Sequence, residues 1–345
     1  MILDGYAPEA LAQAAQALAR GELVGVPTET VYGLGARADQ DAAVAGIFVA
    51  KGRPADHPLI VHVSDLTQAA LFASEMPAIA SKLMAAFWPG PLTVIVPRAP
   101  HMAAAAAGGQ SSVGLRCPAH PVAHALLVAA QELGVPGMAA PSANRFGRVS
   151  PTHAKHVAEE FGPELLVLDG GDCEVGIEST IVDCSRGAAV LLRPGMITPE
   201  QIEAVLGQPL KARDEAAPRA SGTLEAHYAP SATVRLFEGP ESLALALASA
   251  LAKHSSKEPA RAVAVYSRSP FADEAGGETE RWRRHMPDDA AACAHELFAV
   301  LREFDALGAR EIWIEAPPAG SSAWDGVRDR LNRAAAAFMA PGSGK

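Results

Sequence analysis

Apolar positions in the first 210 residues alternate between helical and strand spacing. Leu11, Ala15 and Leu18 lie on one helical face that ends near Gly21, and residues 23–26 form a short apolar run. This pattern predicts a helix followed by a buried strand. Further strands are predicted at 59–63, 92–96, 112–116, 165–168, 180–182 and 189–192, and helices at 41–51, through Leu83, and at 120–133, 152–161 and 199–206. Several strands follow one another without a helix, so we expect a mixed α/β sheet covered by helices.

The helical and strand periodicity lapses between residues 211 and 231. Pro218, Gly222 and Pro230 interrupt a polar stretch there, which indicates a linker. Apolar runs at 234–237, 262–266 and 312–314, separated by helix-like segments, then predict a smaller Rossmann-like α/β unit. We therefore expect a first domain over 1–210, a linker over 211–231 and a second domain over 232–341. No G-x-G-x-x-G follows the strands of the second domain, so it lacks that nucleotide fingerprint.

The composition is that of a globular protein. Of the 345 residues, 49% are apolar and 20% are charged, which argues against a disordered chain. The formal net charge of -10 gives no sign of the broad positive field of proteins that grip nucleic acid through many phosphates. No basic leader precedes an apolar core, and no apolar stretch approaches the length that spans a bilayer. We expect a cytoplasmic protein that needs neither a membrane nor a stable nucleic-acid complex.

The cysteines predict no metal site. They lie far apart, with no C-x-x-C pair and no histidine spacing for zinc, so free, buried thiols are expected. The chain also lacks a P-loop, a kinase signature and a G-x-S-x-G nucleophile elbow. If it uses a nucleotide, it must bind the phosphates in another way.

Polar side chains instead gather at predicted strand ends and turns. Residues 27–35 directly follow the predicted strand at 23–26, which is where open α/β sheets bind ligands, although a glycine-containing turn with a capping threonine explains them equally well. Lys51 and Arg53 place two cations at a helix end, where the usual role is to partner the helix dipole. His62 interrupts an apolar run, where a lone histidine is more often a hydrogen-bonded core residue than a ligand.

Other polar positions recur later in the chain. They are Ser112, Arg116 and His120 around one strand, Ser142 and Asn144 in a turn, Ser150 and Thr152 before a helix, Glu178 and Ser179 entering a strand, and Arg193. Ser, Thr and Asn before helices are usually N-caps, but such caps also leave amides that hold an anion. Taken singly, none of these clusters identifies an activity.

Eight segments taken in order identify a family. They are PTETVYGLG at 27–35, KGRP at 51–54 with PLIVH at 58–62, WPGPLT at 88–93, RCPAH at 116–120, APSAN at 140–144, SPT at 150–152, ESTIVD at 178–183 and RPG at 193–195. Together they closely resemble the threonylcarbamoyl-AMP synthases of the YrdC type. The segment GTLEAHYAP at 222–230 resembles the linker of the long, two-domain form of that family.

The resemblance implies a fold and a reaction. The fold is a twisted, mixed α/β catalytic domain with a deep, positively charged cavity, joined to a C-terminal Rossmann-like domain. The reaction is that of a nucleotidyltransferase, which condenses L-threonine, bicarbonate and ATP, with Mg²⁺ bridging the phosphates, to threonylcarbamoyl-AMP and pyrophosphate. The product goes to a transfer complex that modifies the adenosine next to the tRNA anticodon.

The resemblance also assigns roles to residues. Lys51 and Arg53 are the catalytic cations, and no residue is assigned to a metal. The threonine side is held by Thr30, His62, Arg116, Ala140 and Ser179. The ATP side is held by Arg53, His57, Ser112, Ser142, Ser150 and Arg193, with Tyr228 of the linker closing over the nucleotide.

Two other functions stay open at this point. One is an RNA-binding protein whose basic cavity docks phosphates, although the negative net charge and the hydroxyl-rich motifs count against it. The other is a related enzyme that forms a carbamoyl-adenylate for another acceptor, although such enzymes carry additional domains that this chain lacks.

Overall fold

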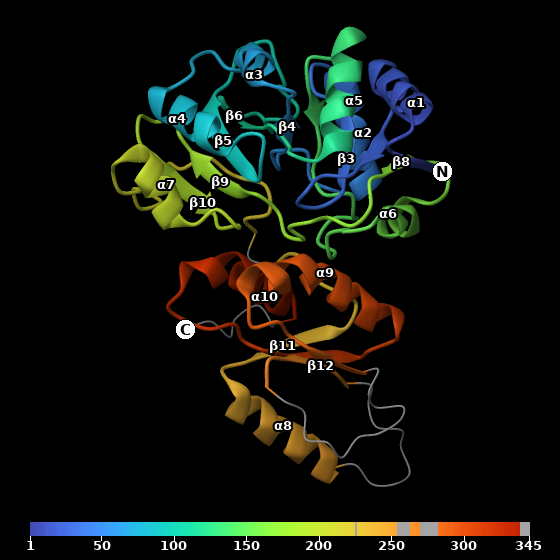
Figure 1. Ribbon diagram of the computed structural model, residues 1–345, viewed down its shortest axis with the longest axis vertical. Coiled ribbons are helices and arrows are strands. Elements are labelled where there is room, and N and C mark those ends of the chain that lie inside the picture. The colour runs from blue at the N-terminus through green and yellow to red at the C-terminus, as the bar shows by residue number, and fades with distance from the viewer. Residues whose placement is uncertain (225, 254–262, 270–281, 339–345) are drawn as a thin grey trace. The chain divides into compact units, whose positions relative to one another are not determined.

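The computed structural model describes residues 1–224, 226–253, 263–269 and 282–338. The chain divides into two compact units (Figure 1). The first contains residues 1–146 and 150–223, and the second contains 147–149 and 224–345. Residues 211–223 of the predicted linker therefore pack with the first unit. Among the described residues, no helix has both the length and the apolar character needed to cross a membrane.

The first unit is built on a mixed sheet, as predicted. In the described part of the chain its ten strands have the order β1-β8-β2-β3-β7-β4-β6-β5-β9-β10. The strands are β1 (Ile2–Asp4), β2 (Val24–Val26), β3 (Gly33–Arg37), β4 (Ile60–His62), β5 (Leu92–Pro97), β6 (Ser112–Arg116), β7 (Met138–Ala139), β8 (Leu166–Asp169), β9 (Thr180–Asp183) and β10 (Val190–Arg193). β4 pairs with β6 and β5 with β9 in parallel, whereas β5 and β6 are antiparallel.

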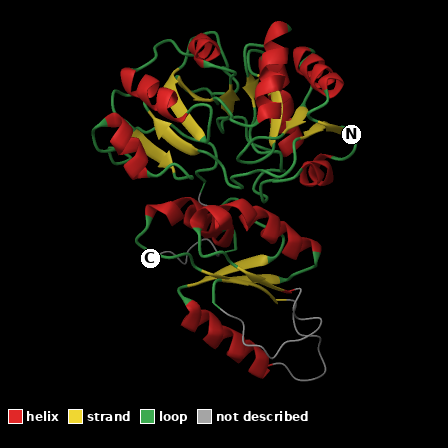
Figure 2. Ribbon diagram, viewed as in Figure 1, coloured by secondary structure: helices red, strands yellow, loops and turns green. Residues whose placement is uncertain are grey.

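Helices cover this sheet (Figure 2). They are α1 (Pro8–Ala19), α2 (Asp41–Lys51), α3 (Leu66–Phe72), α4 (Ala78–Phe87), α5 (Pro121–Glu132), α6 (Ala154–Phe161) and α7 (Pro199–Leu206). α1 packs on α5, and α4 packs on β5 and α7. Leu34, Val61, Val94 and Leu115 are fully buried in the core between helices and sheet. The central strands are therefore held rigidly, which fixes the side chains at their ends.

Helix ends follow local sequence signals. Thr198 and Gln201 form a reciprocal capping box at the start of α7, with Pro199 in the first turn. Gly52 ends α2 in the left-handed region, at φ 62°, where a residue with a Cβ is disfavoured. This turn leaves Lys51 at the helix end and Arg53 just beyond it.

In the described part of the first unit, three strands and one helix were not predicted. β1, β7 and α3 are short, and β3 has the sequence GLGAR, whose glycines indicate a turn rather than a strand. Residues 27–32 do form a turn, in which Thr28 Oγ1 accepts a hydrogen bond of 3.2 Å from the Val31 amide, but the residues from Gly33 onward form a strand. β3 forms because β2 and β7 pair with it on its two sides, so that pairing overrides its weak strand propensity.

The second unit is a small parallel α/β fold, as predicted. Within the described ranges its sheet has the order β11-β14-β12-β13, and every neighbouring pair is parallel. The strands are β11 (Thr233–Phe237), β12 (Val263–Ser267), β13 (Arg283–His285) and β14 (Glu311–Glu315), and the helices are α8 (Pro240–Lys253), α9 (Ala290–Ala306), η2 (Ser322–Trp324) and α10 (Asp325–Ala336). Residue 262, the first of the predicted 262–266 strand, and residues 339–341, the last of the predicted domain, lie outside the described residues.

Candidate active site

Three of the predicted threonine-binding residues meet at the ends of the central strands. β4 ends at His62 and β6 at Arg116, and these two residues are register partners in the parallel pair. Arg116 Nη1 donates a hydrogen bond of 2.8 Å to Thr30 Oγ1, in the connection between β2 and β3. Thr30 Oγ1 lies 2.9 Å from Thr28 Oγ1. All these side chains are buried, so the motifs create one desolvated site that contains a guanidinium, an imidazole and two hydroxyls.

His62 is neutral in this site. Burial and the neighbouring Arg116 lower the pKa of its imidazole from 6.5 to about 3, because both disfavour a second positive charge. Its buried Nδ1 has no hydrogen-bond partner among the described residues. A neutral imidazole next to a guanidinium gives the site a hydrogen-bonding group that does not repel Arg116.

The His62 shift predicts how stability depends on pH. The unfolded chain binds a proton at this histidine below about pH 6.5, and the folded chain does so only near pH 3. The free energy of unfolding therefore falls by about 1.4 kcal/mol for each unit by which the pH is lowered within this window. Urea unfolding should show that wild type loses about 2 kcal/mol more than His62→Gln between pH 6.5 and 5. His101→Gln, at an exposed histidine, is the matched control and should follow wild type. Parallel pH dependences for wild type and His62→Gln would contradict the assignment.

A second polar cluster lies where β5, β9 and β10 pair. Ser179, just before β9, places its Oγ 2.8 Å from Thr93 Oγ1 on β5. Arg193, at the end of β10, donates from Nε and Nη2 to the Ser179 carbonyl oxygen at 3.1 and 2.8 Å. A Cβ at Gly195 would lie 2.5 Å from the Thr180 nitrogen, so the R-P-G turn requires glycine. Arg193 is thus fixed beside Ser179.

Residues 219–221 lie against this cluster. Arg193 Nη1 donates to the Ser221 carbonyl oxygen at 2.9 Å, and Arg53 Nη2 lies 3.4 Å from Ser221 Oγ. The Arg219 amide donates to Gln110 Oε1 at 2.7 Å, and its guanidinium pairs with Asp56 at 3.0 Å. We call residues 219–221 the plug segment. It contacts both arginines that the motifs assign to ATP.

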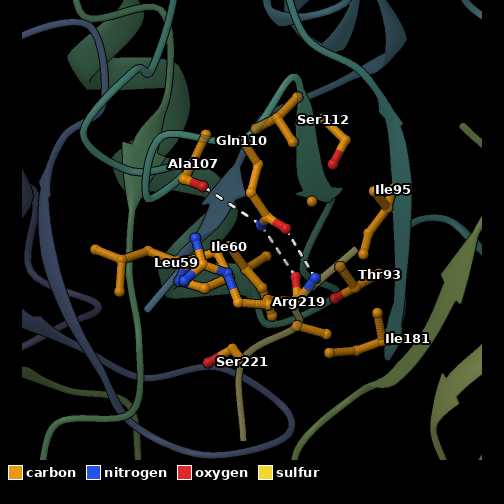
Figure 3. Close-up of a pocket in the computed structure, with 14 residues that line it drawn as sticks. Leu59, Ile60, Thr93, Ile95, Ala107, Gln110, Ser112, Ile181, Arg219 and Ser221 are labelled. Atoms are coloured by element: carbon orange, nitrogen blue, oxygen red, sulfur yellow. Dashed lines mark hydrogen bonds between the residues drawn. The ribbon is translucent and has the colours of Figure 1, made fainter. Parts of the chain in front are cut away.

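The plug segment lines one side of a small cavity over β4, β5, β6 and β9. Figure 3 shows Gln110 hydrogen-bonded to the backbone of Arg219, with Ser112, Thr93 and Ser221 among the other lining residues. The lining residues are Pro58, Leu59, Ile60, Thr93, Ile95, Ala107, Gln110, Ser112, Val113, Gly114, Ile181, Arg219, Ala220 and Ser221. The free volume is about 20 Å³, which is room for roughly one water molecule. A nucleotide can enter this space only if the plug segment moves.

Lys51 is buried at the end of α2. Its ammonium donates to the carbonyl oxygens of Ser142 and Asn144, so it ties the helix to the APSAN turn. Burial, and then the charge of Arg53, lower the pKa of Lys51 well below its ordinary value, while Glu178 opposes the shift. Lys51 therefore organises the backbone of the predicted ATP-binding turn in this structure.

The other residues predicted to bind ATP in this region are Ser150, His57 and Arg53. Ser150 Oγ donates to Glu178 Oε1 at 2.5 Å. The His57 ring packs edge-on against Phe146, with centroids 5.4 Å apart, and the Arg53 guanidinium lies 5.9 Å from the same ring. Burial and Arg53 lower the pKa of His57. Phe146 thus restrains two side chains that the motifs assign to ATP.

Two predicted residues stand apart from these contacts. The Ala140 amide donates to the Ile60 carbonyl oxygen at 3.0 Å, so this residue contributes backbone and a small side chain. Tyr228 belongs to the second unit, where its ring is 1% exposed and lies 5.4 Å from the Phe298 ring and 5.5 Å from the Arg330 guanidinium. Its lid role stays a prediction.

The motifs assign no role to four residues of these clusters. Glu29 pairs with Arg116, Thr93 with Ser179, Glu178 with Ser150, and Ser221 with both ATP-side arginines. Glu29, Thr93 and Glu178 lie inside the quoted motifs, so their position was a usable signal. Ser221 lies in a polar linker, and nothing in its local sequence marks it.

The thiols and acidic groups do not form reactive or metal-binding sites in the described residues. Each cysteine is free and buried, as expected, and burial raises the pKa of Cys117 to about 11 and of Cys184 to about 12. Thiols with such pKa values are poor nucleophiles at neutral pH. Across the described ranges, no group of three or more His, Cys, Asp or Glu side chains is placed to hold a metal ion.

Comparisons with known proteins cover both units. A family model for Sua5, YciO and YrdC proteins, described as "Telomere recombination", matches residues 16–195. A model described as "Threonylcarbamoyl-AMP synthase, C-terminal domain" matches residues 197–336. The threonylcarbamoyl-AMP synthase of Pyrococcus abyssi is 40% identical over 310 residues, covering 88% of this chain and 87% of its own. That of Bacillus subtilis is 45% identical over 236 residues, covering 66% and 67%.

Solved structures agree with this assignment. The crystal structure of Pyrococcus abyssi Sua5 complexed with L-threonine is 38% identical, with a TM-score of 0.82, and covers 95% of this chain and 94% of that chain. A variant of the same protein has a TM-score of 0.84 at 35% identity, covering 98% and 96%. The similarity spans the fold, the motifs and the C-terminal unit, so the chain belongs to the threonylcarbamoyl-AMP synthase family.

Proposed function

We propose that this protein condenses L-threonine, bicarbonate and ATP to threonylcarbamoyl-AMP, pyrophosphate and water. The observation that carries the proposal is the buried group of Thr30, His62 and Arg116 at the ends of β4 and β6. A second group, Arg53 and Arg193, contacts Ser221, which lines the cavity over β5 and β9. The proposal is supported by synthases of the same length class, one of whose solved structures holds L-threonine.

In the proposed reaction, charge is the main obstacle. The threonine amine captures CO2 from bicarbonate as a carbamate, and a carbamate oxygen then attacks the α-phosphorus of ATP and expels pyrophosphate. Two unit charges about 4 Å apart interact by about 4 kcal/mol at an effective dielectric near 20. Arg116 would bind the threonine carboxylate, while Arg53 and Arg193 would bind phosphates once the plug segment releases them. Positioning and charge neutralisation then favour the attack.

The proposal requires no covalent protein nucleophile. The protonated cysteines and the hydrogen-bonded Ser179 are suited to binding rather than attack. Mg²⁺ would enter with ATP and neutralise its phosphates, because the described residues offer no acidic cluster of their own to hold the ion. We therefore treat the metal as part of the nucleotide substrate.

The proposed product serves tRNA modification. A mixed anhydride of a carbamate and AMP is an activated acyl donor, so a partner transfer complex would pass it to the adenosine beside the anticodon. We propose that this occurs in the cytoplasm without a membrane or a stable RNA complex. The net charge of -10 supports the last point over the RNA-binding alternative.

Mass detection of the product tests the proposed function. The full chain is mixed with ATP, Mg²⁺, threonine and ¹³C-bicarbonate, and threonylcarbamoyl-AMP should appear with the label and with equimolar pyrophosphate. Omission of threonine or bicarbonate should remove both products. Carbamoyl phosphate supplied in their place distinguishes the related carbamoyl-adenylate chemistry. Salt-dependent RNA binding without pyrophosphate release would instead support the RNA-binding function.

A further inference from the structure

Glu29 is a buried carboxylate at the centre of the proposed threonine site. Its side chain is 6% exposed, and its Oε1 lies 2.7 Å from Arg116 Nη2. Its Oε2 accepts a hydrogen bond of 3.1 Å from the Ala119 amide, and its backbone oxygen accepts one of 2.7 Å from the Val175 amide. Residues 116–119 therefore hold the carboxylate, and Val175 holds the backbone of the same residue.

Glu29 is one of three residues that hold the Arg116 guanidinium. Nη2 faces Glu29, Nη1 donates to Thr30 Oγ1 at 2.8 Å, and Nε lies 3.4 Å from the Gly90 carbonyl oxygen. A guanidinium has more N–H groups than these contacts use, so Arg116 can still bind a carboxylate. An arginine fixed in advance loses less conformational entropy when the ligand binds.

A contribution to stability alone explains this pair poorly. Taking both ions out of water costs nearly as much as their attraction returns, and apolar residues of similar volume are often at least as stabilising. The pair also has a defined position: it joins the β2–β3 connection to the end of β6, where His62 is the register partner of Arg116. Its main effect is to set the direction of the guanidinium.

We propose that Glu29 is a positioning residue that orients Arg116 for the carboxylate of threonine. The inference rests on the proposed function. Because Glu29 acts through Arg116 and lies on the threonine side of the site, its removal weakens threonine binding selectively. ATP, which meets Arg53 and Arg193, is affected little.

Glu29→Gln tests this role. The amide keeps the shape and the acceptor for Ala119 but removes the charge that orients Arg116. Calorimetry should give a threonine Kd about tenfold higher than that of wild type, equivalent to about 1.4 kcal/mol, while the KM for ATP stays within about twofold. Glu29→Asp keeps the charge but withdraws it by one methylene, so it should give a smaller loss. It also provides a folded variant if Glu29→Gln is unstable.

A double-mutant cycle with Arg116→Lys distinguishes a positioning role of Glu29 from a purely structural one. Lysine lacks the planar fork that Glu29 orients, so Glu29→Gln should change the threonine Kd by less than about twofold in the Arg116→Lys background. The full effect in that background, or an equal rise in the threonine Kd and the KM for ATP, would overturn the inference. Wild type failing to bind threonine rejects the proposed function itself, whereas an active wild type with unchanged threonine affinity in Glu29→Gln rejects only the role of Glu29.

Discussion

Arg53→Ala is expected to lose ATP–pyrophosphate exchange dependent on threonine and bicarbonate by about 10²- to 10³-fold. Arg53 is 8% exposed, lies against Phe146 and donates to the Pro58 carbonyl oxygen at 2.8 Å. Its guanidinium is therefore aimed in advance at the space that the plug segment fills. Loss of a cation so placed should reduce turnover more than it reduces stability. Single-turnover exchange assays with purified protein measure the effect.

Two variants serve as controls for this experiment. Arg53→Lys keeps the charge but loses the planar fork, so its activity should fall between those of wild type and Arg53→Ala. Arg20→Ala removes an arginine whose side chain is 56% exposed and pairs only with Glu22 among the described residues, and it should leave activity unchanged. Near-wild-type exchange by a folded Arg53→Ala enzyme would remove Arg53 from the catalytic site.

Truncation after Leu210 is expected to retain the fold of the first unit and to lose activity by about 10²-fold or more. The helices and strands of this unit end at Leu206, so its main core is intact in the shorter chain. The truncation removes only Ala217 and Ala220 from the edge of a smaller apolar cluster on β5, β9 and β10. The truncation removes both the plug segment and Tyr228, and with them the contacts to Arg53 and Arg193. Circular dichroism checks the fold, and product formation measures activity.

A chain that ends at Thr223 separates the two parts that the truncation removes. It keeps the plug segment with its bonds to Gln110 and Asp56 but lacks Tyr228. If Tyr228 closes over the nucleotide, this chain is also inactive, and full-length Tyr228→Phe, which keeps the ring, stays active. Full activity of either truncated chain would show that closure by Tyr228 is dispensable.

The longer elements of the fold follow from local patterns. The apolar runs at 92–96, 112–116 and 180–182 correspond to β5, β6 and β9, because β-branched residues between turn signals predict buried strands well. β3 could not be found in this way. Its glycines carry no strand propensity, and only the pairing with β2 and β7, which lie elsewhere in the chain, makes it a strand.

In the candidate site, too, local sequence marks some residues and only tertiary contacts mark others. Thr30, His62 and Arg116 were predicted as site residues because each lies in a motif. The structure brings them together since β4 and β6 pair in parallel next to β7. Ser221 was not found, because the polar linker gives no local signal for a residue that contacts Arg53 and Arg193. Contacts across such distances depend on how the whole chain packs.

The sequence by itself determined the mixed α/β class, the two-unit organisation and the family, since ordered motifs and apolar periodicity are properties of neighbouring residues. Only the tertiary structure decided which charges meet. It paired Glu29 with Arg116, placed the plug segment over the cavity and buried Tyr228 in the second unit. The physical reason is that a buried charge or a closed cavity is defined by groups distant in sequence, whose desolvation and pairing exist only once the strands have assembled.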